Sequence, residues 1–479
     1  MKTISAQKLH SLLLRDTEHA LVDVREIDPF SQNHLLFAVP LPYSRLELLV
    51  TDLLPRLSVP MVICDGGEGL AERAALRLLA LGYTDVAVLE GAIGAWQSAG
   101  YETYSGVNVP SKAFGEFVEH ESGTPSLSAD EVHQMMENGE DMIVLDSRPY
   151  AEFQWASIPT GLCCSGAELV YRGFSAVPST ETKVVVNCAG RTRSIIGAQS
   201  LINAGLPNNV YALRNGIMGW RLSGYEPAKG EKKWATAPDD NGRARSKAAA
   251  EKVASRFKVH EITPQELKTW RDERTSRSLF MLDVRTIEEF ENGHLNDAVH
   301  APGGQVIQVI QATDEYIGVR NARIVLIDND GIRSAMTASW LNQMGQKDVR
   351  ILQLNDSTEA LVSGSRRATV AGLTEANCTS VSPEEAKHKQ QQGAIVLDVS
   401  LSTAYRAAHI PGAWFILRSQ LSESLSALPD ANEYIISSED GSMAKHCAVE
   451  LDALVGKSVS ILDGGNTGWK GHGFDLVPD

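Results

Sequence analysis

The 479-residue sequence is poor in the features that mark disulfide-rich, metal-binding or membrane-spanning proteins. It has only six cysteines, of which only Cys163 and Cys164 are close in sequence, and no C-x-x-C pair. Adjacent cysteines rarely form a disulfide of good geometry, and structural zinc sites usually use spaced pairs. The cysteine content therefore predicts a protein of the reducing cytoplasm without structural zinc.

Long apolar runs and positive net charge are also missing. No apolar stretch approaches the length of a membrane span, and residues 1–7 lack the apolar core of a signal peptide. The net charge is −16, so a phosphate backbone would repel the chain. We therefore expect neither a membrane nor a nucleic-acid partner.

The chain does contain an internal repeat. An apolar strand pattern that ends in an aspartate occurs four times, at residues 20–25, 143–148, 280–285 and 395–400. A second apolar stretch follows in each repeat, and the residues after it are Asp65, Cys188, Asp328 and Ser438. A leucine lies 13 residues after each of these four positions, which supports their alignment. Repeats of this kind indicate tandem copies of one structural unit.

Each repeat alternates strand and helix patterns over roughly a hundred residues, a usual size for one α/β domain. We place the four domains at residues 1–104, 125–227, 256–362 and 374–479. The intervening segments are predicted linkers, and 227–255 has the least packed composition of the three. We therefore expect the first two domains to pair with each other, and the last two likewise.

The second repeat carries the only cysteine at the aligned position. Val184–Val186 is β-branched and typical of a buried parallel strand, and the residues after Ser194 have helical spacing. Cys188 thus lies between a strand end and a helix start, where backbone N–H groups and the helix dipole favour a thiolate and a bound anion. The other five cysteines are expected to be packing residues, with Cys164 the candidate for a resolving thiol.

Arginines in and near this loop suit an oxyanion. Arg191 and Arg193 each offer two N–H groups to one anion. Arg148 ends a neighbouring strand, and ligands of open α/β sheets bind beyond the carboxyl ends of the strands. We predict Cys188 as the catalytic residue. The predicted substrate-binding residues are Ala189, Gly190, Arg191, Thr192, Arg193, Ser194 and Arg148.

The ordered motifs resemble the rhodanese family. They are the Asp-x-Arg strand end, the His-Ile-Pro-Gly-Ala turn at 409–413, the strand–Cys–loop–helix unit, and the Gly-x-x-Gly-Trp pattern at 216–220 and 465–469. The resemblance covers nearly the whole chain outside the linkers. It implies four tandem, doubly wound α/β domains, each with a central parallel sheet.

The resemblance also implies a chemistry. A sulfane-sulfur donor, often thiosulfate, would load Cys188 as a persulfide, and cyanide or a thiol would remove the outer sulfur. No metal or organic cofactor is needed. In tandem members of the family the catalytic cysteine typically lies in the second domain of a pair, as Cys188 does. Asp65, Asp328 and Ser438 form no persulfide, so the first, third and fourth domains are expected to be inactive in this reaction.

Three other functions stay open. A cysteine phosphatase needs an arginine six positions after the cysteine, where this chain has Ser194. A mercaptopyruvate sulfurtransferase typically has Cys-Gly-Ser/Thr-Gly-Val-Thr in the loop, and the arginines here favour a doubly charged inorganic donor instead. A non-catalytic scaffold role is kept for the third and fourth domains. The sequence thus predicts a cytoplasmic, thiosulfate-type sulfurtransferase.

Overall fold

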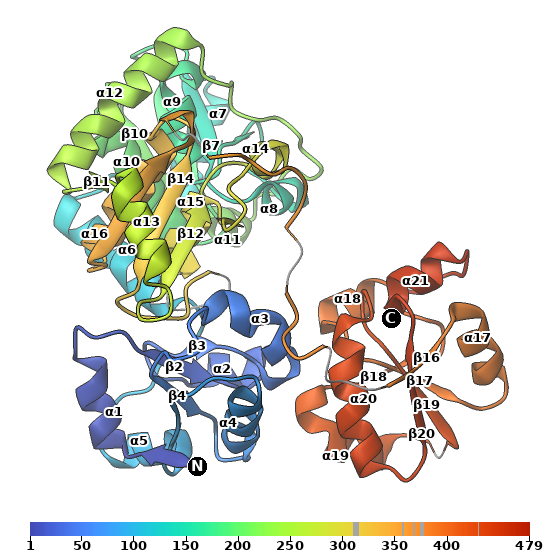
Figure 1. The fold of residues 1–479 in the computed structure, drawn as a ribbon. Coiled ribbons are helices and arrows are strands. Elements are labelled where there is room, and N and C mark those ends of the chain that lie inside the picture. The colour runs from blue at the N-terminus through green and yellow to red at the C-terminus, as the bar shows by residue number, and fades with distance from the viewer. Residues whose placement is uncertain (310–315, 357–358, 367–368, 374–377, 430) are drawn as a thin grey trace.

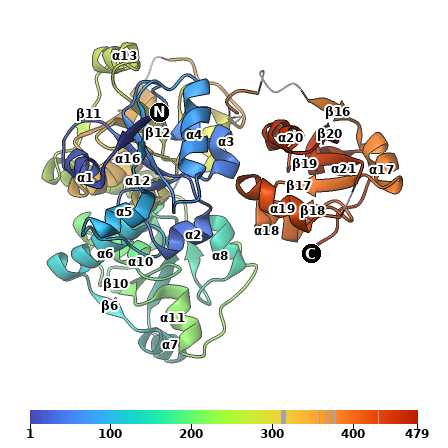
Figure 2. The same ribbon diagram turned by 90° about the horizontal axis from the view of Figure 1, so that it is seen from below.

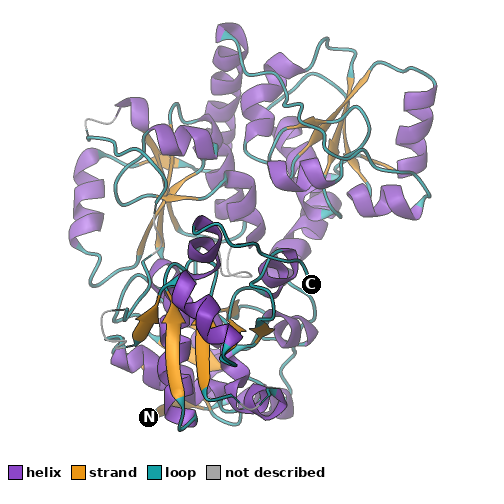
Figure 3. Ribbon diagram, turned by 90° about the vertical axis from the view of Figure 1, so that its right-hand side faces the viewer, coloured by secondary structure: helices purple, strands orange, loops and turns teal. Residues whose placement is uncertain are grey.

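The computed structural model describes all residues except 310–315, 357–358, 367–368, 374–377 and 430 (Figure 1). The described residues form four five-stranded parallel sheets, one per repeat, which define domains 1 to 4. Domain 2 has the strand order β6-β10-β9-β7-β8, and the other three sheets repeat it. Helices cover both faces of the sheets (Figure 3). The predicted fold class, four tandem α/β domains with central parallel sheets, is confirmed.

The elements follow the same order in each domain. Domain 1 contains β1 (Lys2–Ile4), α1 (Ala6–Leu13), β2 (Ala20–Asp23), α2 (Ile27–Gln32), β3 (Val39–Pro40), α3 (Leu46–Leu53), β4 (Met61–Cys64), α4 (Leu70–Ala80), β5 (Val86–Leu89) and α5 (Ala92–Ser98). After α6 (Val109–Ser122), domain 2 contains β6 (Ser126–Leu127), α7 (Ala129–Glu137), β7 (Met142–Asp146), α8 (Tyr150–Trp155), β8 (Leu162–Cys163), α9 (Glu168–Ala176), β9 (Lys183–Asn187), α10 (Thr192–Asn203), β10 (Val210–Leu213) and α11 (Gly216–Leu222).

The C-terminal half begins with α12 (Asp240–Arg256). Domain 3 contains β11 (His260–Glu261), α13 (Pro264–Asp272), β12 (Leu279–Asp283), α14 (Ile287–Asn292), β13 (Val299–His300), α15 (Gly303–Val309), β14 (Arg323–Asp328), α16 (Ile332–Gln343) and β15 (Asp348–Gln353). Domain 4 contains β16 (Thr379–Val381), α17 (Pro383–Gln391), β17 (Ile395–Asp398), α18 (Ser402–Ala407), β18 (Trp414–Phe415), α19 (Leu421–Ala427), β19 (Glu433–Ser437), α20 (Ser442–Leu454), β20 (Ser458–Leu462) and α21 (Gly465–Gly471).

The strand that leads to Cys188 is central and fully covered. Val184, Val185 and Val186 of β9 are buried, as expected for a parallel strand with helices on both faces. In the β7–β9 register Asp146 lies opposite Asn187. The residues that follow these two strands therefore meet at one edge of the sheet.

The expected pairing of domains was wrong. Domain 2 packs against domain 3, where Arg333 of α16 donates to Glu168 of α9 at 2.8 Å and Trp340 Nε1 donates to Ser200 Oγ at 2.8 Å. Domain 1 pairs with domain 4 through Arg418, which donates to Glu47 of α3 at 2.5 Å. Figures 1 and 2 show domain 4, in red, set apart from domains 2 and 3 and beside α3.

The segment 227–255 explains this difference, because most of its second half is helical and packed. Helix α12 contacts both α9 and α16, and buries Ala249, Ala250 and Val253. Ser246 Oγ donates to the carbonyl of Val170 at 2.9 Å. Alanine and serine allow close helix packing without an obvious apolar stripe, so composition alone suggested a loose linker. Helix α12 instead holds domains 2 and 3 together.

Two predicted boundaries near the start of domain 4 include residues that the structure does not describe. Positions 367–368 of the predicted linker 363–373 and residue 374, the predicted start of domain 4, lie outside the described residues.

None of the described helices is both long and apolar enough to cross a membrane.

Candidate active site

Cys188 follows β9 directly and lies four residues before α10; it is 1% exposed. Its carbonyl accepts the amide of Ile217 at 2.9 Å, and the carbonyl of Ala189 accepts the amide of Met218 at 3.1 Å. Gly216 has φ +49°, and a Cβ there would lie 2.2 Å from the Cys188 oxygen. A glycine at this position therefore lets α11 approach and hold the loop.

Arg148 is buried and lies two residues after the end of β7. Its Nε donates to Asp146 Oδ1 at 2.8 Å, and its Nη2 donates to Asp146 and to the carbonyl of Ala156. Arg25 and Arg285 bind Asp23 and Asp283 in the same way in domains that lack the cysteine. This geometry favours a structural role for Arg148, and its contact with substrate stays a prediction.

The two loop arginines are paired with glutamates from elsewhere in the chain. Arg191 Nε donates to Glu116 at 2.5 Å, and Nη2 donates to Glu119, both on α6. Arg193 makes a two-pronged ion pair with Glu152 of α8, at 2.8 and 2.9 Å. Three carboxylates therefore face two guanidinium groups, and the excess positive charge expected of the loop is neutralised.

Sequence reasoning missed these glutamates, yet a signal for one of them exists in the repeats. Glu152 lies six residues after Asp146, and Glu289 lies six residues after Asp283 in domain 3. In domain 3, Arg333 is five residues after Asp328, as Arg193 is after Cys188, and it pairs with Glu289 at 2.5 Å. The corresponding positions in domains 1 and 4 have neither residue, so the arginine and the glutamate occur together or not at all.

The two arginines also reach across the interface in matching ways. Arg333 Nη1 donates to Glu168 of domain 2 at 2.8 Å, and Arg193 Nη1 donates to Gln305 of domain 3 at 3.4 Å. Glu168 and Gln305 each lie 22 residues after the aspartate of their own repeat. Domains 2 and 3 therefore face each other as related halves, but only one half has a cysteine.

In domains 1 and 3, backbone amides surround the aspartate side chain at the position aligned with Cys188. Asp328 accepts the amides of Gly331 at 2.8 Å and Ser334 at 3.0 Å. Asp65 accepts the amides of Gly67 and Ala71, both at 3.0 Å. In each case the loop amides and the first turn of the following helix surround a carboxyl group.

In domain 2 the aligned position holds Cys188, between the end of β9 and the start of α10. The amide six residues after Cys188 is that of Ser194, in the first turn of α10, where N–H groups have no partner within the helix. Ser194 Oγ donates to the carbonyl of Arg191 at 2.8 Å and braces the loop. By analogy with Asp65 and Asp328, we expect the loop to surround a negatively charged group at Cys188.

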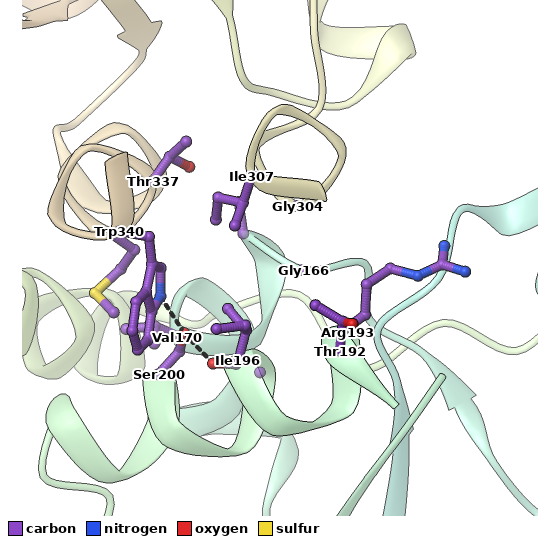
Figure 4. Close-up of a pocket in the computed structure, with 13 residues that line it drawn as sticks. Gly166, Val170, Thr192, Arg193, Ile196, Ser200, Gly304, Ile307, Thr337 and Trp340 are labelled. Atoms are coloured by element: carbon purple, nitrogen blue, oxygen red, sulfur yellow. Dashed lines mark hydrogen bonds between the residues drawn. The ribbon is translucent and has the colours of Figure 1, made fainter. Parts of the chain in front are cut away.

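Two cavities lie beside the loop, between domains 2 and 3. The smaller holds about 30 Å³, with Thr192, Arg193 and Trp340 in its walls (Figure 4). The larger holds about 240 Å³ and is lined by both domains, including Tyr150 and Gln305. Gly166, Ala167 and Gly304 line both cavities, which are therefore adjacent. Cys188 itself lines neither of them.

The remaining cysteines are poor candidates for redox partners of Cys188. Burial raises the pKa of the Cys164 thiol well above its ordinary value, which disfavours the nucleophilic thiolate. Among the described residues, no three His, Cys, Asp or Glu side chains form a group that could hold a metal ion.

Comparisons with known proteins agree with this architecture. A family model of the rhodanese-like domain matches residues 5–99, 128–223, 263–354 and 382–472. The chain is similar over 100% of its length to a thiosulfate sulfurtransferase from Pseudomonas aeruginosa, with 42% identity, a TM-score of 0.93 and 90% of that chain covered.

A shorter stretch is similar to YrkF, a protein of Bacillus subtilis (strain 168) that carries the provisional name of sulfur carrier protein. The identity is 37% over 75 residues, which are 16% of this chain and 38% of the relative. The matches of the family model cover all four repeats and most of the chain. The chain therefore belongs to the rhodanese family and contains four rhodanese-like domains.

Proposed function

We propose that the protein is a sulfurtransferase in which Cys188 carries sulfane sulfur as a persulfide. One observation carries the proposal: Cys188 stands where Asp65 and Asp328 place a carboxyl group among loop amides. Family membership and the Pseudomonas relative, named a thiosulfate sulfurtransferase, support the same class of reaction. The cytoplasmic location predicted from cysteine content is part of this proposal.

The reaction has two nucleophilic halves. The Cys188 thiolate attacks the sulfane sulfur of thiosulfate, the S–S bond of the donor breaks, and sulfite leaves with the electron pair. Cyanide or a thiolate then attacks the outer sulfur, and the Cys188 thiolate leaves. The amides from Ala189 to Ser194 would stabilise the charge on the persulfide, as an oxyanion hole does.

The arginines would position the loop as well as the donor. Arg193 reaches a donor oxyanion only by sharing or releasing its ion pair with Glu152, and Arg191 is similarly bound to Glu116. The proposed binding site keeps the predicted residues Ala189, Gly190, Arg191, Thr192, Arg193 and Ser194. Arg148, predicted as a seventh, is proposed to have a structural role instead, because it is buried and bound to Asp146.

Mercaptopyruvate stays an alternative sulfur donor, because glutamates neutralise the positive charge of the loop. The predicted preference for a doubly charged inorganic donor rested on two arginines, and three glutamates offset that charge. A phosphatase is less favoured, because the loop has Ser194 where the arginine is needed. Domains 1 and 3 have a carboxylate in the nucleophile position and fit a supporting role.

Intact mass measurement tests the proposal. Incubation with thiosulfate should add the mass of one sulfur atom, and cyanide should remove it with formation of thiocyanate. Cys188→Ser should gain nothing, whereas the matched variant Cys164→Ser should load normally. Mercaptopyruvate in place of thiosulfate gives the donor preference from the loading rates. An adduct that persists in Cys188→Ser, or aryl-phosphate turnover that needs Cys188, would overturn the proposal.

A further inference from the structure

Three large apolar side chains are exposed around the Cys188 loop. Trp155, Met218 and Leu222, called here the apolar face, are 66%, 62% and 83% exposed. The Met218 amide donates to the carbonyl of Ala189 at 3.1 Å, and Leu222 lies one turn further along α11. The Arg221 guanidinium lies 4.8 Å from the centre of the Trp155 ring and links α11 to the end of α8. The face is thus continuous with the loop.

The other domains have no apolar face. Domains 1, 2 and 4 align on the tryptophan of their last helix, Trp96, Trp220 and Trp469. The positions of Met218 and Leu222 are then Gly94 and Ser98 in domain 1, and Thr467 and Gly471 in domain 4. The position of Trp155, nine residues after the strand aspartate, is Gln32, Asn292 and Ala407 elsewhere. The apolar face therefore accompanies the nucleophile and is not a requirement of the fold.

The charge around the apolar face is also particular to domain 2. Residues 214–233 contain five basic and two acidic side chains, in a chain with net charge −16. The aligned residues 90–109 of domain 1 contain two glutamates and no basic side chain. In domain 4 the aligned stretch 463–479 has one lysine and three aspartates.

Two of these basic residues flank Trp155. Lys229 follows Ala228, whose amide donates to the carbonyl of Ser157 at 2.9 Å, next to the end of α8. Arg221 and Lys229 are exposed, and neither takes part in an ion pair found among the described residues. An apolar centre with a cationic rim is typical of a docking site for a protein of opposite charge.

We propose that the apolar face docks an acidic protein that presents a cysteine, and that this cysteine accepts sulfur from Cys188. The proposal rests on the proposed function. Cys188 is 1% exposed, so the partner must bring its thiol to the loop on an extended segment. Arg221 and Lys229 would attract the acidic partner, and Met218 and Leu222 would bury apolar area against it.

The transfer step balances without an added oxidant. The partner's thiolate attacks the outer sulfur of the Cys188 persulfide, and the S–S bond of that persulfide breaks. Cys188 leaves as a thiolate with the electron pair. The partner cysteine becomes the persulfide, so sulfane sulfur moves between proteins without release.

The experiment uses the full-length protein loaded with thiosulfate and freed of excess donor. Two peptide probes each carry one cysteine, flanked by glutamate and leucine in one and by lysine and leucine in the other. The rate of peptide persulfide formation is followed by mass spectrometry, with cyanide as the small acceptor. We expect the acidic peptide to react roughly tenfold faster than the basic one at low salt, and this advantage to shrink as salt is raised.

Matched variants locate the effect. Arg221→Glu with Lys229→Glu should slow the acidic peptide roughly tenfold, and Leu222→Ser, which copies Ser98 of domain 1, should slow it severalfold. Transfer to cyanide should not change. Lys470→Glu is the control, because Lys470 follows Trp469 as Arg221 follows Trp220. It should leave both rates as they are.

Each contrary result has its own meaning. An unchanged rate with the acidic peptide in the charge-reversed variant, or an equal loss with cyanide, overturns docking at the apolar face. A wild-type dimer that Leu222→Ser converts to monomers would show that a second copy covers the face, and also overturns it. Failure of Cys188 to load at all would instead refute the proposed function, and the docking proposal would fall with it.

Discussion

Arg333 offers the sharpest test of what holds domains 2 and 3 together. It is fully buried at 0% side-chain exposure, and its Nη1 donates to Glu168 at 2.8 Å and to Glu289 at 2.5 Å. Burial acts to raise the pKa of Glu289, but the hydrogen bonds and charge of Arg333 lower it to about 2. Replacing Arg333 by methionine would leave Glu289 without its paired cation and Glu168 with Arg172 alone.

Breaking a buried ion pair by removing one partner costs about 3–5 kcal/mol. We therefore expect Arg333→Met to make opening of the interface easier by at least a hundredfold, since about 1.4 kcal/mol corresponds to a factor of ten. Hydrogen exchange measured by mass spectrometry on peptides from α9 and α16 reports this opening directly. Peptides from α17 and α20 of domain 4, which does not pack against Arg333, serve as the internal reference.

The double variant Arg333→Met, Glu289→Gln separates the loss of the cation from the presence of a bare carboxylate, and it leaves the pair of Glu168 with Arg172 intact. It should recover most of the lost protection, because a neutral amide at position 289 needs no counter-charge. Protection in Arg333→Met that falls by less than about threefold would refute the reasoning. A double variant as unprotected as the single one would refute it as well.

Three further outcomes are expected. Gly216→Ala should fold, since Ala92 holds φ 56° at the aligned position of domain 1. Sulfur transfer at Cys188 should slow, because the new Cβ displaces the Cys188 carbonyl. A thermal melt tests the first expectation and a cyanide assay the second, and a normal transfer rate would contradict the reasoning. Burial acts to raise the pKa of Glu47, but Arg418 lowers it from 4.5 to about 2, so about 3 kcal/mol of stability is present above pH 4.5 and lost as the pH falls towards 2. Glu47→Gln should flatten this pH dependence in acid unfolding curves, and an unchanged curve would contradict the assignment. Arg148→Met should lower the free energy of unfolding by about 3–5 kcal/mol with little change in KM for thiosulfate, whereas a raised KM at normal stability would assign Arg148 to the substrate.

The fold and the position of the nucleophile could be predicted because their signals are local. A buried strand such as 184–186 can be predicted from its own side chains. The repeat aligns Cys188 with Asp65, Asp328 and Ser438, because a leucine follows each of the four positions by 13 residues. The doubly wound α/β class follows from that alternation.

The partners of the loop arginines were beyond such reasoning. Glu116 and Arg191 are 75 residues apart, and nothing in either local pattern specifies their contact. The contact between Glu152 and Arg193 has one signal in the sequence, which is that Glu289 and Arg333 recur at the aligned positions of domain 3. That recurrence can be interpreted as a contact only when the structures of the two domains are compared. The charge of a site depends on every element packed around it, so a loop with two arginines proved to be electrically balanced.

Four related α/β units, and one cysteine at their aligned position, could be predicted from the sequence because apolar periodicity and turn residues act over a few positions. The packing of domain 2 against domain 3, and of α12 against both, is visible only in the three-dimensional fold. That fold also places Met218 and Trp155 beside the cysteine loop, on helices some 60 residues apart. Contacts between distant segments depend on how whole elements pack, and packing is set by complementary surfaces that no local pattern encodes.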